Sequence, residues 1–317
     1  MYNNFLDEVK SFVSNSCNLF LKKSQKYEDY ASDPNLLSQL QEADYPDFLS
    51  YVFKKKTGES LNLKNPKTFN QKIQWLKLKD NNDEKSQLTD KVLVRNFVKS
   101  KIGEEFLKPA LWIGKRFDEI MFEQLPDKFI IKANNGSKKY LMIKDKKRFL
   151  ETPQLLEAVK IKFYTWLNSP YYLVSALEMQ YKDIEPQIII EPVLCDEGTS
   201  VPVDIQIYCF NGTPKIFELK SNTEPRMCTV FGENFEQSDI KFMKKDISIF
   251  QQPDDNLKKA VELSAVLCQN FKFVRVDWIV CGGKLYFNDM TFTPESGFYD
   301  FIDSKQNIKL GDMLKLN

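Results

Sequence analysis

The sequence predicts an α+β fold, in which a helical N-terminal region precedes two regions built from short strands and helices. Two patterns support this prediction. Apolar residues recur at helical spacing up to about residue 60, and from about residue 126 short apolar runs alternate with polar turns. With 317 residues, 42% hydrophobic and 13% aromatic, the chain is long enough for two or three lobes.

The first part of the chain is predicted to be helical because its apolar side chains fall on one face of a helix. Phe5, Val9 and Phe12 have this spacing, and so have Phe48 and Val52. Few stretches before residue 60 show the alternation that is typical of strands.

Two further helices are predicted next. Asn65 and Pro66 mark a turn, and Thr68 is suited to cap a helix that starts at Phe69. A second helix is expected over residues 89–99.

Most of the remaining strands are predicted to pair as hairpins. Two apolar runs flank the polar turn Asn134–Lys139, which indicates a hairpin with an unusually polar tip. Further strands are expected at residues 187–194, 203–210 and 214–220, with Asn211–Gly212 as a tight turn, and helices at about 153–168 and 253–269. The last two strands, joined at residues 281–283, are expected to alternate cleanly between inward and outward side chains.

The charge balance argues against a nucleic acid as a partner. The chain has 45 Lys and Arg against 44 Asp and Glu, so no long-range field would attract it to DNA or to an anionic membrane. There is no run of about 18 apolar residues, and polar residues interrupt the first apolar stretch, residues 12–21. Neither a membrane span nor a cleavable leader is therefore expected.

The sequence contains no histidine, which excludes Ser-His-Asp, Cys-His and His-metal chemistries. Any catalysis must use Lys, Arg, Asp, Glu, backbone amides or a hard cation. The six cysteines form no CxxC pair, so neither a zinc knuckle nor a redox dithiol is indicated, and reduced thiols are expected.

The final hairpin carries the strongest chemical signal. Arg275 and Asp277 share one face of its first strand, and Asp289 and Thr291 share one face of its second. Two carboxylates and a hydroxyl near one point are the oxygen ligands that Mg²⁺ prefers. The alternative is that both acids are solvent-facing strand charges, balanced by Arg275 and Lys284.

Two other segments are suited to a nucleotide. Lys132 ends a strand beside the turn Asn134–Lys139, whose amides and ammonium groups could hold phosphate oxygens, unless the turn is an ordinary exposed tip. The strand at 187–194 reaches Glu191 and Pro192, where free backbone groups could bind an adenine edge, or where the strand simply ends.

The order of these signals resembles the ATP-grasp fold, in which two α+β lobes clamp ATP. The blocks NPKTFNQKIQWLKLKD, LPDKFIIKANNGS, IYCFNGTPKIF and FVRVDWIVCGGKLYFNDMTFTPESGF look like the TupA-like ATP-grasp family, over about residues 62–317. The resemblance implies a helical region at 1–60 outside the family, a lead-in region at 61–125, a small nucleotide lobe at 126–195 and a large lobe with the metal site at 196–317.

The resemblance also implies ATP and Mg²⁺ as cofactors, and roles for individual residues. The nucleotide would be held by Lys91, Lys132, Asn135, Gly136, Ser137, Lys138, Glu191, Val193, Leu194 and Asp196. The magnesium positions would be Asp277, Asp289 and Thr291, and the substrate would meet Arg226, Ser296 and Gly297. Arg275, Lys132 and Asp289 would be catalytic, with Arg275 stabilising charge on the transferred phosphoryl group.

The function implied by the resemblance is an ATP-dependent carboxylate-amine ligase. It would activate a sugar acid or an amino acid as an acyl phosphate and join it to an amine, in the cytoplasm, during the synthesis of a bacterial surface polysaccharide such as capsule. Saccharide-linked or sugar-nucleotide-linked substrates, and association with polysaccharide assembly enzymes, belong to the same expectation. The alternatives are a sugar transferase of the same pathway, such as a glycosyltransferase, and a non-catalytic nucleotide-binding member.

Several positions depart from the family pattern. Asn135 replaces the usual His, and Gln206 replaces a common Lys. Asp289 replaces the usual Glu, and Glu295 replaces a Gly. Lys138 and Lys139 replace small residues. They cluster at the nucleotide loop and on the acceptor side.

Overall fold

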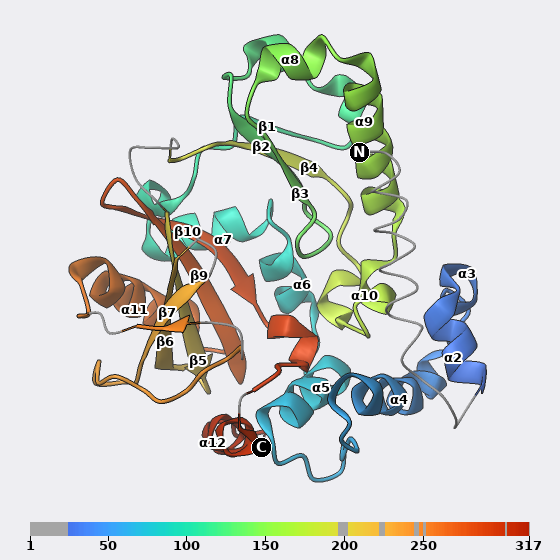
Figure 1. The fold of residues 1–317 in the computed structure, drawn as a ribbon, viewed down its shortest axis with the longest axis vertical. Coiled ribbons are helices and arrows are strands. Elements are labelled where there is room, and N and C mark those ends of the chain that lie inside the picture. Colours follow the sequence, from blue (N-terminus) through green and yellow to red (C-terminus); the bar gives the residue numbers. More distant parts are fainter. Residues whose placement is uncertain are drawn as a thin grey trace.

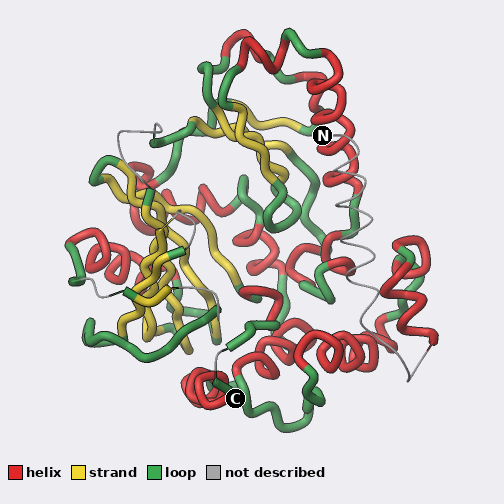
Figure 2. Tube along the Cα trace, viewed as in Figure 1, coloured by secondary structure: helices red, strands yellow, loops and turns green. Residues whose placement is uncertain are grey.

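The computed structural model describes residues 25–195, 202–221, 226–243, 247–249, 252–301 and 303–316. Its strands form two sheets (Figure 1), and helices surround both (Figure 2). The α-helices are α2 (Gln25–Ser32), α3 (Pro34–Leu37), α4 (Tyr45–Thr57), α5 (Phe69–Lys79), α6 (Asp83–Thr89), α7 (Val94–Ile102), α8 (Lys146–Leu150), α9 (Pro153–Asn168), α10 (Tyr171–Val174), α11 (Asp255–Leu267) and α12 (Ser304–Met313). No helix in this part of the chain is both long and apolar enough to cross a membrane.

The strands and short turns complete the list of elements. The strands are β1 (Trp112–Gly114), β2 (Phe129–Ala133), β3 (Tyr140–Ile143), β4 (Ile188–Pro192), β5 (Val203–Phe210), β6 (Thr213–Ser221), β7 (Met227–Phe231), β8 (Ile247–Ser248), β9 (Phe273–Cys281) and β10 (Lys284–Thr291). Short 3-10 turns are η1 (Glu42–Asp44), η2 (Glu104–Phe106), η3 (Phe117–Glu119), η4 (Phe122–Gln124), η5 (Met179–Tyr181) and η6 (Pro294–Gly297).

The helical N-terminal region is confirmed from residue 25 onwards by α2, α3 and α4. Phe48 and Leu49 of α4 are buried in one cluster with Leu173 of α10 and with Leu177. This cluster attaches the N-terminal helices to the centre of the molecule (Figure 1). The apolar positions predicted before residue 25 lie outside the described residues.

The smaller sheet has the strand order β1-β4-β2-β3, and its neighbouring strands are antiparallel. In β2, Phe129 and Ile131 are buried in a core with Phe149 of α8 and Phe163 of α9. Helices α8 and α9 therefore cover one face of this sheet (Figure 1). Because side chains alternate along a strand, Lys132 points to the other face.

The larger sheet has the order β10-β9-β5-β6-β7-β8 and is antiparallel except for the β7–β8 pair. Ile205, Ile207 and Val276 lie on its apolar face, in a core with Leu257 and Leu263 of α11. Helix α11 thus covers this face (Figure 1).

The opposite face of the larger sheet is apolar only at one end. There Phe69 of α5 packs on Phe210 and Phe273, with ring centroids 5.9 and 5.1 Å apart, and Leu310 of α12 lies in the same cluster. Beyond this end the residues on the same face become polar, beginning with Arg275. This polar part is therefore the candidate position for a functional site.

The tight turn predicted at Asn211–Gly212 is confirmed, since both residues have left-handed backbones, with φ of 48° and 76°. Residues 282 and 283, both glycine, have the same conformation between β9 and β10. This type of turn matches the twist of the paired strands.

The expectation that the final hairpin alternates cleanly is wrong. Phe287 pairs with Trp278 and Asp289 pairs with Asp277, so that Asn288 is an extra residue on β10. Phe287 belongs to the core, where its ring lies 5.9 Å from that of Trp278. In a regular strand Asp289 would lie on the same face as Phe287, two residues earlier. The bulge turns it to the opposite, polar face.

The helix predicted at 89–99 begins later, at Val94. A turn precedes the helix and is held by Asp90, whose Oδ1 accepts hydrogen bonds from the amides of Val92 and Leu93. Its Oδ2 accepts a third from the side chain of Asn134 at 3.0 Å. This buried carboxylate therefore joins the start of α7 to the β2–β3 turn.

The expectation of reduced thiols is wrong for one pair, because Cys195 and Cys281 form a disulfide. Their positions, 86 residues apart, give no sequence signal of pairing. Cys209, Cys228 and Cys268 are buried and form no disulfide.

Candidate active site

A cleft of about 1100 Å³ lies between the two sheets. Of the residues singled out from the sequence, it is lined by Lys91, Lys132, Ser137, Lys138, Glu191, Val193, Leu194, Arg226, Arg275, Asp277, Asp289, Thr291 and Ser296. Asn135, Gly136 and Gly297 are not among its lining residues, and Asp196 lies outside the described residues.

The floor of the cleft is the polar face of the larger sheet. Asp289, Asp277 and Gln206 are directly opposite one another on β10, β9 and β5, and the row continues with Glu218 on β6. Directly opposite residues in antiparallel strands project to the same side, so these side chains form one continuous polar row.

A second row, with Thr291 opposite Arg275, lies beside the first and is joined to it by a bidentate ion pair. Arg275 donates from Nε to Oδ1 of Asp277 at 2.6 Å and from its terminal nitrogen to Oδ2 at 2.7 Å. Thr291 Oγ1 donates to the same Oδ2 at 3.2 Å. Burial raises the pKa of Asp277, although Arg275 opposes this change. Arg275 and Thr291 thus hold this carboxylate in one orientation.

Lys91 connects the loop before α7 with the floor and with the small lobe. Its Nζ lies 3.4 Å from Oδ2 of Asp289 and donates to the carbonyl of Gly136 at 3.4 Å. Lys91 and Asp289 are 198 residues apart in the chain, and only the family resemblance implied that they lie at one site. The ammonium group of Lys91 therefore lies within reach of both walls of the cleft.

Glu191 forms a buried charge cluster on the opposite wall. Its Oε2 lies 2.6 Å from Nζ of Lys132 and 3.3 Å from Nζ of Lys108, and Lys108 also donates to Oδ1 of Asn288 at 2.6 Å. Burial would raise the pKa of Glu191, but the two lysines outweigh it and lower the pKa to about 2. The Glu191 carboxylate is therefore ionised and engaged with lysines.

The predicted nucleotide loop divides into two parts. Asn135 is buried and donates to the carbonyls of Trp166 and Leu167, which gives it a structural contact with α9. Lys138 instead reaches across the cleft to Oε2 of Glu295, 3.5 Å away. Lys138 and Glu295, which both depart from the family pattern, thus contact each other.

Among the residues that line the cleft but were not predicted from the sequence are two lysines, Lys220 and Lys108. Lys220 donates to Gln206 at 3.0 Å and pairs with Glu218 at 3.0 Å, and Lys108 bridges Glu191 and Asn288. Lys220 shares a strand face with Glu218, so alternation alone could have placed it beside the polar row. Lys108 carries no comparable signal, because it lies in a loop.

The carboxylates of the floor fit a cation that also binds phosphate. Among the described residues there is no group of three or more Asp, Glu, Cys or His side chains close enough to hold a metal ion. Asp277 and Asp289 are nevertheless adjacent on neighbouring strands, and Mg²⁺ commonly uses one or two carboxylates together with phosphates and waters. This donor set fits Mg²⁺ bound together with a nucleotide.

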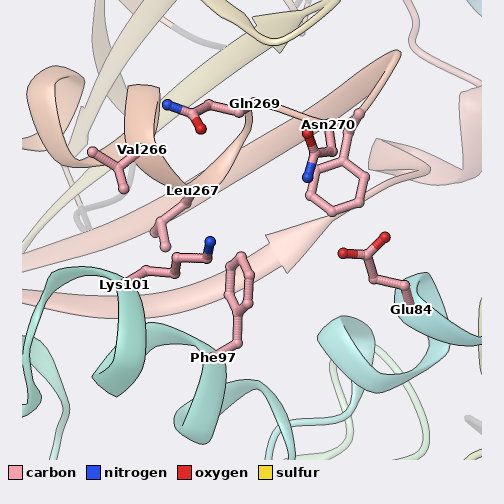
Figure 3. Close-up of a pocket in the computed structure, with 8 residues that line it drawn as sticks. Glu84, Phe97, Lys101, Val266, Leu267, Gln269 and Asn270 are labelled. Atoms are coloured by element: carbon pink, nitrogen blue, oxygen red, sulfur yellow. The ribbon is translucent and has the colours of Figure 1, made fainter.

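A second cavity, of about 140 Å³, lies among the helices that cover the apolar face of the larger sheet (Figure 3). Phe97 and Lys101 come from α7, and Glu84 comes from α6. Its lining contains one carboxylate and one ammonium group, so it lacks the paired acids and clustered lysines of the large cleft.

The sequence matches the model of one protein family, TupA-like ATPgrasp, over residues 71–315. No curated protein sequence matches it significantly. Among solved structures it is similar to the ATP complex of D-alanine–D-alanine ligase from Bacillus anthracis, with 15% identity and a TM-score of 0.37, over 65% of this chain and 54% of that chain. It is also similar to an L-amino acid ligase from Bacillus licheniformis, with 11% identity and a TM-score of 0.36, over 91% of this chain and 64% of that chain. The alignments span less than two thirds of either ligase.

Proposed function

Because the chain belongs to the TupA-like ATPgrasp family and has its ATP-grasp fold, we propose that it is an ATP-dependent ligase that joins a carboxylate to an amine. The substrate would be a sugar acid or an amino acid, and the reaction would take place in the cytoplasm, where ATP is available. The product would serve the synthesis of a bacterial surface polysaccharide.

One observation supports this proposal above all others. Two lysines and two aspartates that are distant in the chain, Lys91, Lys132, Asp277 and Asp289, line one cleft. Lys91 also contacts Asp289 at 3.4 Å. Ammonium groups bind phosphate oxygens, and carboxylates bind the cation that accompanies a triphosphate.

In the proposed reaction, an oxygen of the substrate carboxylate attacks the γ-phosphorus of ATP, and the bond to the β-phosphate oxygen breaks. ADP and an acyl phosphate are formed. The amine then attacks the acyl carbon, phosphate leaves, and the amine loses a proton. Lys91 and Lys132 would hold phosphate oxygens, while Arg275 would stabilise the charge on the transferred group.

The remaining assignments follow the walls of the cleft. Ser137 and Lys138 would cover the phosphates, and Val193 and Leu194 would bind the adenine edge. Asp277, Asp289 and Thr291 would hold Mg²⁺, which supplies neutralisation of phosphate charge when bound.

The charge of the cleft supports acidic substrates. Eleven Lys and Arg and six Asp and Glu line it, whereas the whole chain has a formal net charge of +1. A lysine-rich concave surface raises the local concentration of anions. A nucleotide together with a uronic acid or an acidic amino acid fits this excess.

The test is the release of ADP against a panel of uronic acids and amino acids, each paired with small amines. We expect one matched pair to turn over, and Lys132→Ala and Asp289→Ala to abolish the release while circular dichroism remains unchanged. Lys147→Ala, an exposed lysine of α8, is the matched control and should keep full activity. Full turnover in both site variants would contradict the proposal, and hydrolysis of a sugar nucleotide without ATP consumption would favour a sugar transferase.

A further inference from the structure

The loop that follows β10 has an unusual backbone where it enters the cleft. Glu295, Ser296 and Gly297 are three successive left-handed residues, with φ of 47°, 53° and 68°. Glycine adopts this conformation freely, but each of the other two residues is strained by roughly 1–2 kcal/mol. Surrounding contacts must hold such a segment in place, and strain of this kind is often found at functional sites.

The contacts come from a polar stripe on α5. Asn70, Gln74 and Lys77 are spaced i, i+4 and i+7, so they lie on one face of the helix, and their exposed fractions are only 2%, 0% and 1%. Burial of three polar side chains on one helix face is unfavourable unless each finds a partner.

All three side chains bind the loop. Asn70 exchanges two hydrogen bonds with the backbone of Tyr299, at 2.9 and 3.1 Å. Gln74 Nε2 donates to the carbonyls of Ser296 and Gly297, at 3.0 and 2.8 Å. Lys77 Nζ donates to both the carbonyl and the hydroxyl oxygen of Ser296, each at 2.8 Å.

Lys77 also holds a second left-handed segment on the other side. Its Nζ donates to the carbonyl of Ala176 at 2.8 Å, and Ala176 and Leu177 have φ of 59° and 63°. The hydroxyl of Ser296 donates to the carbonyl of Ser175 at 2.5 Å. One ammonium group thus joins two strained turns that both reach the cleft.

The counter-charge of Lys77 is Glu178, which lies in the wall of the cleft and is itself buried. The hydroxyl of Thr293 donates to Glu178, and Gln180 donates to Thr293 at 2.6 Å. Burial lowers the pKa of Lys77 to about 7 and raises the pKa of Glu178, although each of the two charges opposes the change in the other. An apolar side chain would fill the same space without that penalty, so packing alone does not explain a lysine here.

We propose that Lys77 is a positioning residue, which holds Ser296 and the strained turn in the shape that the second substrate meets. The inference rests on the proposed function for its kinetic part, because Thr293, Glu295 and Ser296 line the same cleft as the nucleotide residues. Lys77 would act through its hydrogen bonds to Ser296 and Ala176.

The first test measures the loop without any substrate. In Lys77→Met, amide hydrogen exchange over residues 293–299 is expected to be about 10- to 100-fold faster, as expected when hydrogen bonds from a charged donor are removed. Exchange in the β2–β3 hairpin should not change. Lys79→Met, an exposed lysine on the same helix, is the matched control and should behave as the unmodified protein.

The second test separates positioning from general damage by kinetics. Lys77→Met should raise KM for the acid or amine substrate by about 10-fold or more, while KM for ATP stays within about twofold. Gln74→Leu, which removes two hydrogen bonds to the same turn but no charge, should change the same constants in the same direction. It replaces the first variant if Lys77→Met does not fold.

The outcomes distinguish the two proposals. Unchanged exchange over residues 293–299 in both variants would overturn the role of Lys77. An equal rise in KM for all substrates would also overturn it. If no substrate pair releases ADP from the unmodified protein, the proposed function fails, whereas the exchange measurement still decides the role of Lys77.

Discussion

Replacing Glu191 with Gln tests whether the charge cluster on the cleft wall is held by one carboxylate. The substitution keeps the size of the side chain and removes only its charge. Lys132, at 2.6 Å, and Lys108, at 3.3 Å, would then face each other in a buried site without a counter-charge. Removing one partner from a buried ion pair usually destabilises a protein by about 3–5 kcal/mol.

The pKa of Glu191 gives a similar magnitude. The lysines lower it from its ordinary value of 4.5 to about 2, and at roughly 1.4 kcal/mol per pKa unit this corresponds to about 3 kcal/mol. The cluster as a whole contributes less, because burial and the neighbouring Lys132 lower the pKa of Lys108 to about 8. The expected decrease in the free energy of unfolding therefore comes mainly from leaving the two lysines buried without a counter-charge. It does not equal the net stabilisation by the intact cluster.

The assay is urea unfolding followed by circular dichroism at several pH values. A carboxylate with a lowered pKa stabilises the protein above its unfolded pKa, and this contribution is lost as the pH falls through the folded value. The difference between the two proteins should thus be constant between about pH 5 and pH 7 and shrink as the pH falls from about 4.5 towards 2. Glu151 is an exposed acid at the C-terminal end of α8, and Glu151→Gln is the control. A difference below about 1 kcal/mol at pH 7, or one that does not change between pH 6 and pH 3, would refute the reasoning.

Three further predictions concern other parts of the molecule. Lys138 and Glu295 form a pair whose side chains are 81% and 39% exposed, so a double-mutant cycle with Ala should give a coupling of about 1 kcal/mol or less, weakened by salt, and a larger value would contradict a rim contact. Asp289→Asn should weaken calorimetric binding of ATP with Mg²⁺ by about tenfold or more and leave binding without Mg²⁺ nearly unchanged, whereas equal losses in both conditions would argue against a metal ligand. Thr68→Ala should lower the free energy of unfolding by about 1 kcal/mol, because Thr68 accepts a hydrogen bond from the amide of Gln71 at the start of α5, and no change would show that water replaces this cap.

The amino-acid sequence by itself determined the elements that depend on neighbouring residues. Short apolar segments bounded by turn residues placed β5, β9 and β10, and the Asn211–Gly212 turn followed from the backbone freedom of those two residues. It also placed Arg275 with Asp277 on one strand face. These properties could be predicted because they arise between residues a few positions apart.

Only the tertiary structure decided which of the charges meet. The bulge at Asn288 exists because Phe287 must fill the core beside Trp278, and it is this packing that turns Asp289 towards Asp277. The cluster around Glu191 and the contacts of Lys77 likewise join segments that are distant in the chain. A buried lysine reads in the sequence like any exposed one, because burial and partner are set by the packing of whole lobes and not by local spacing.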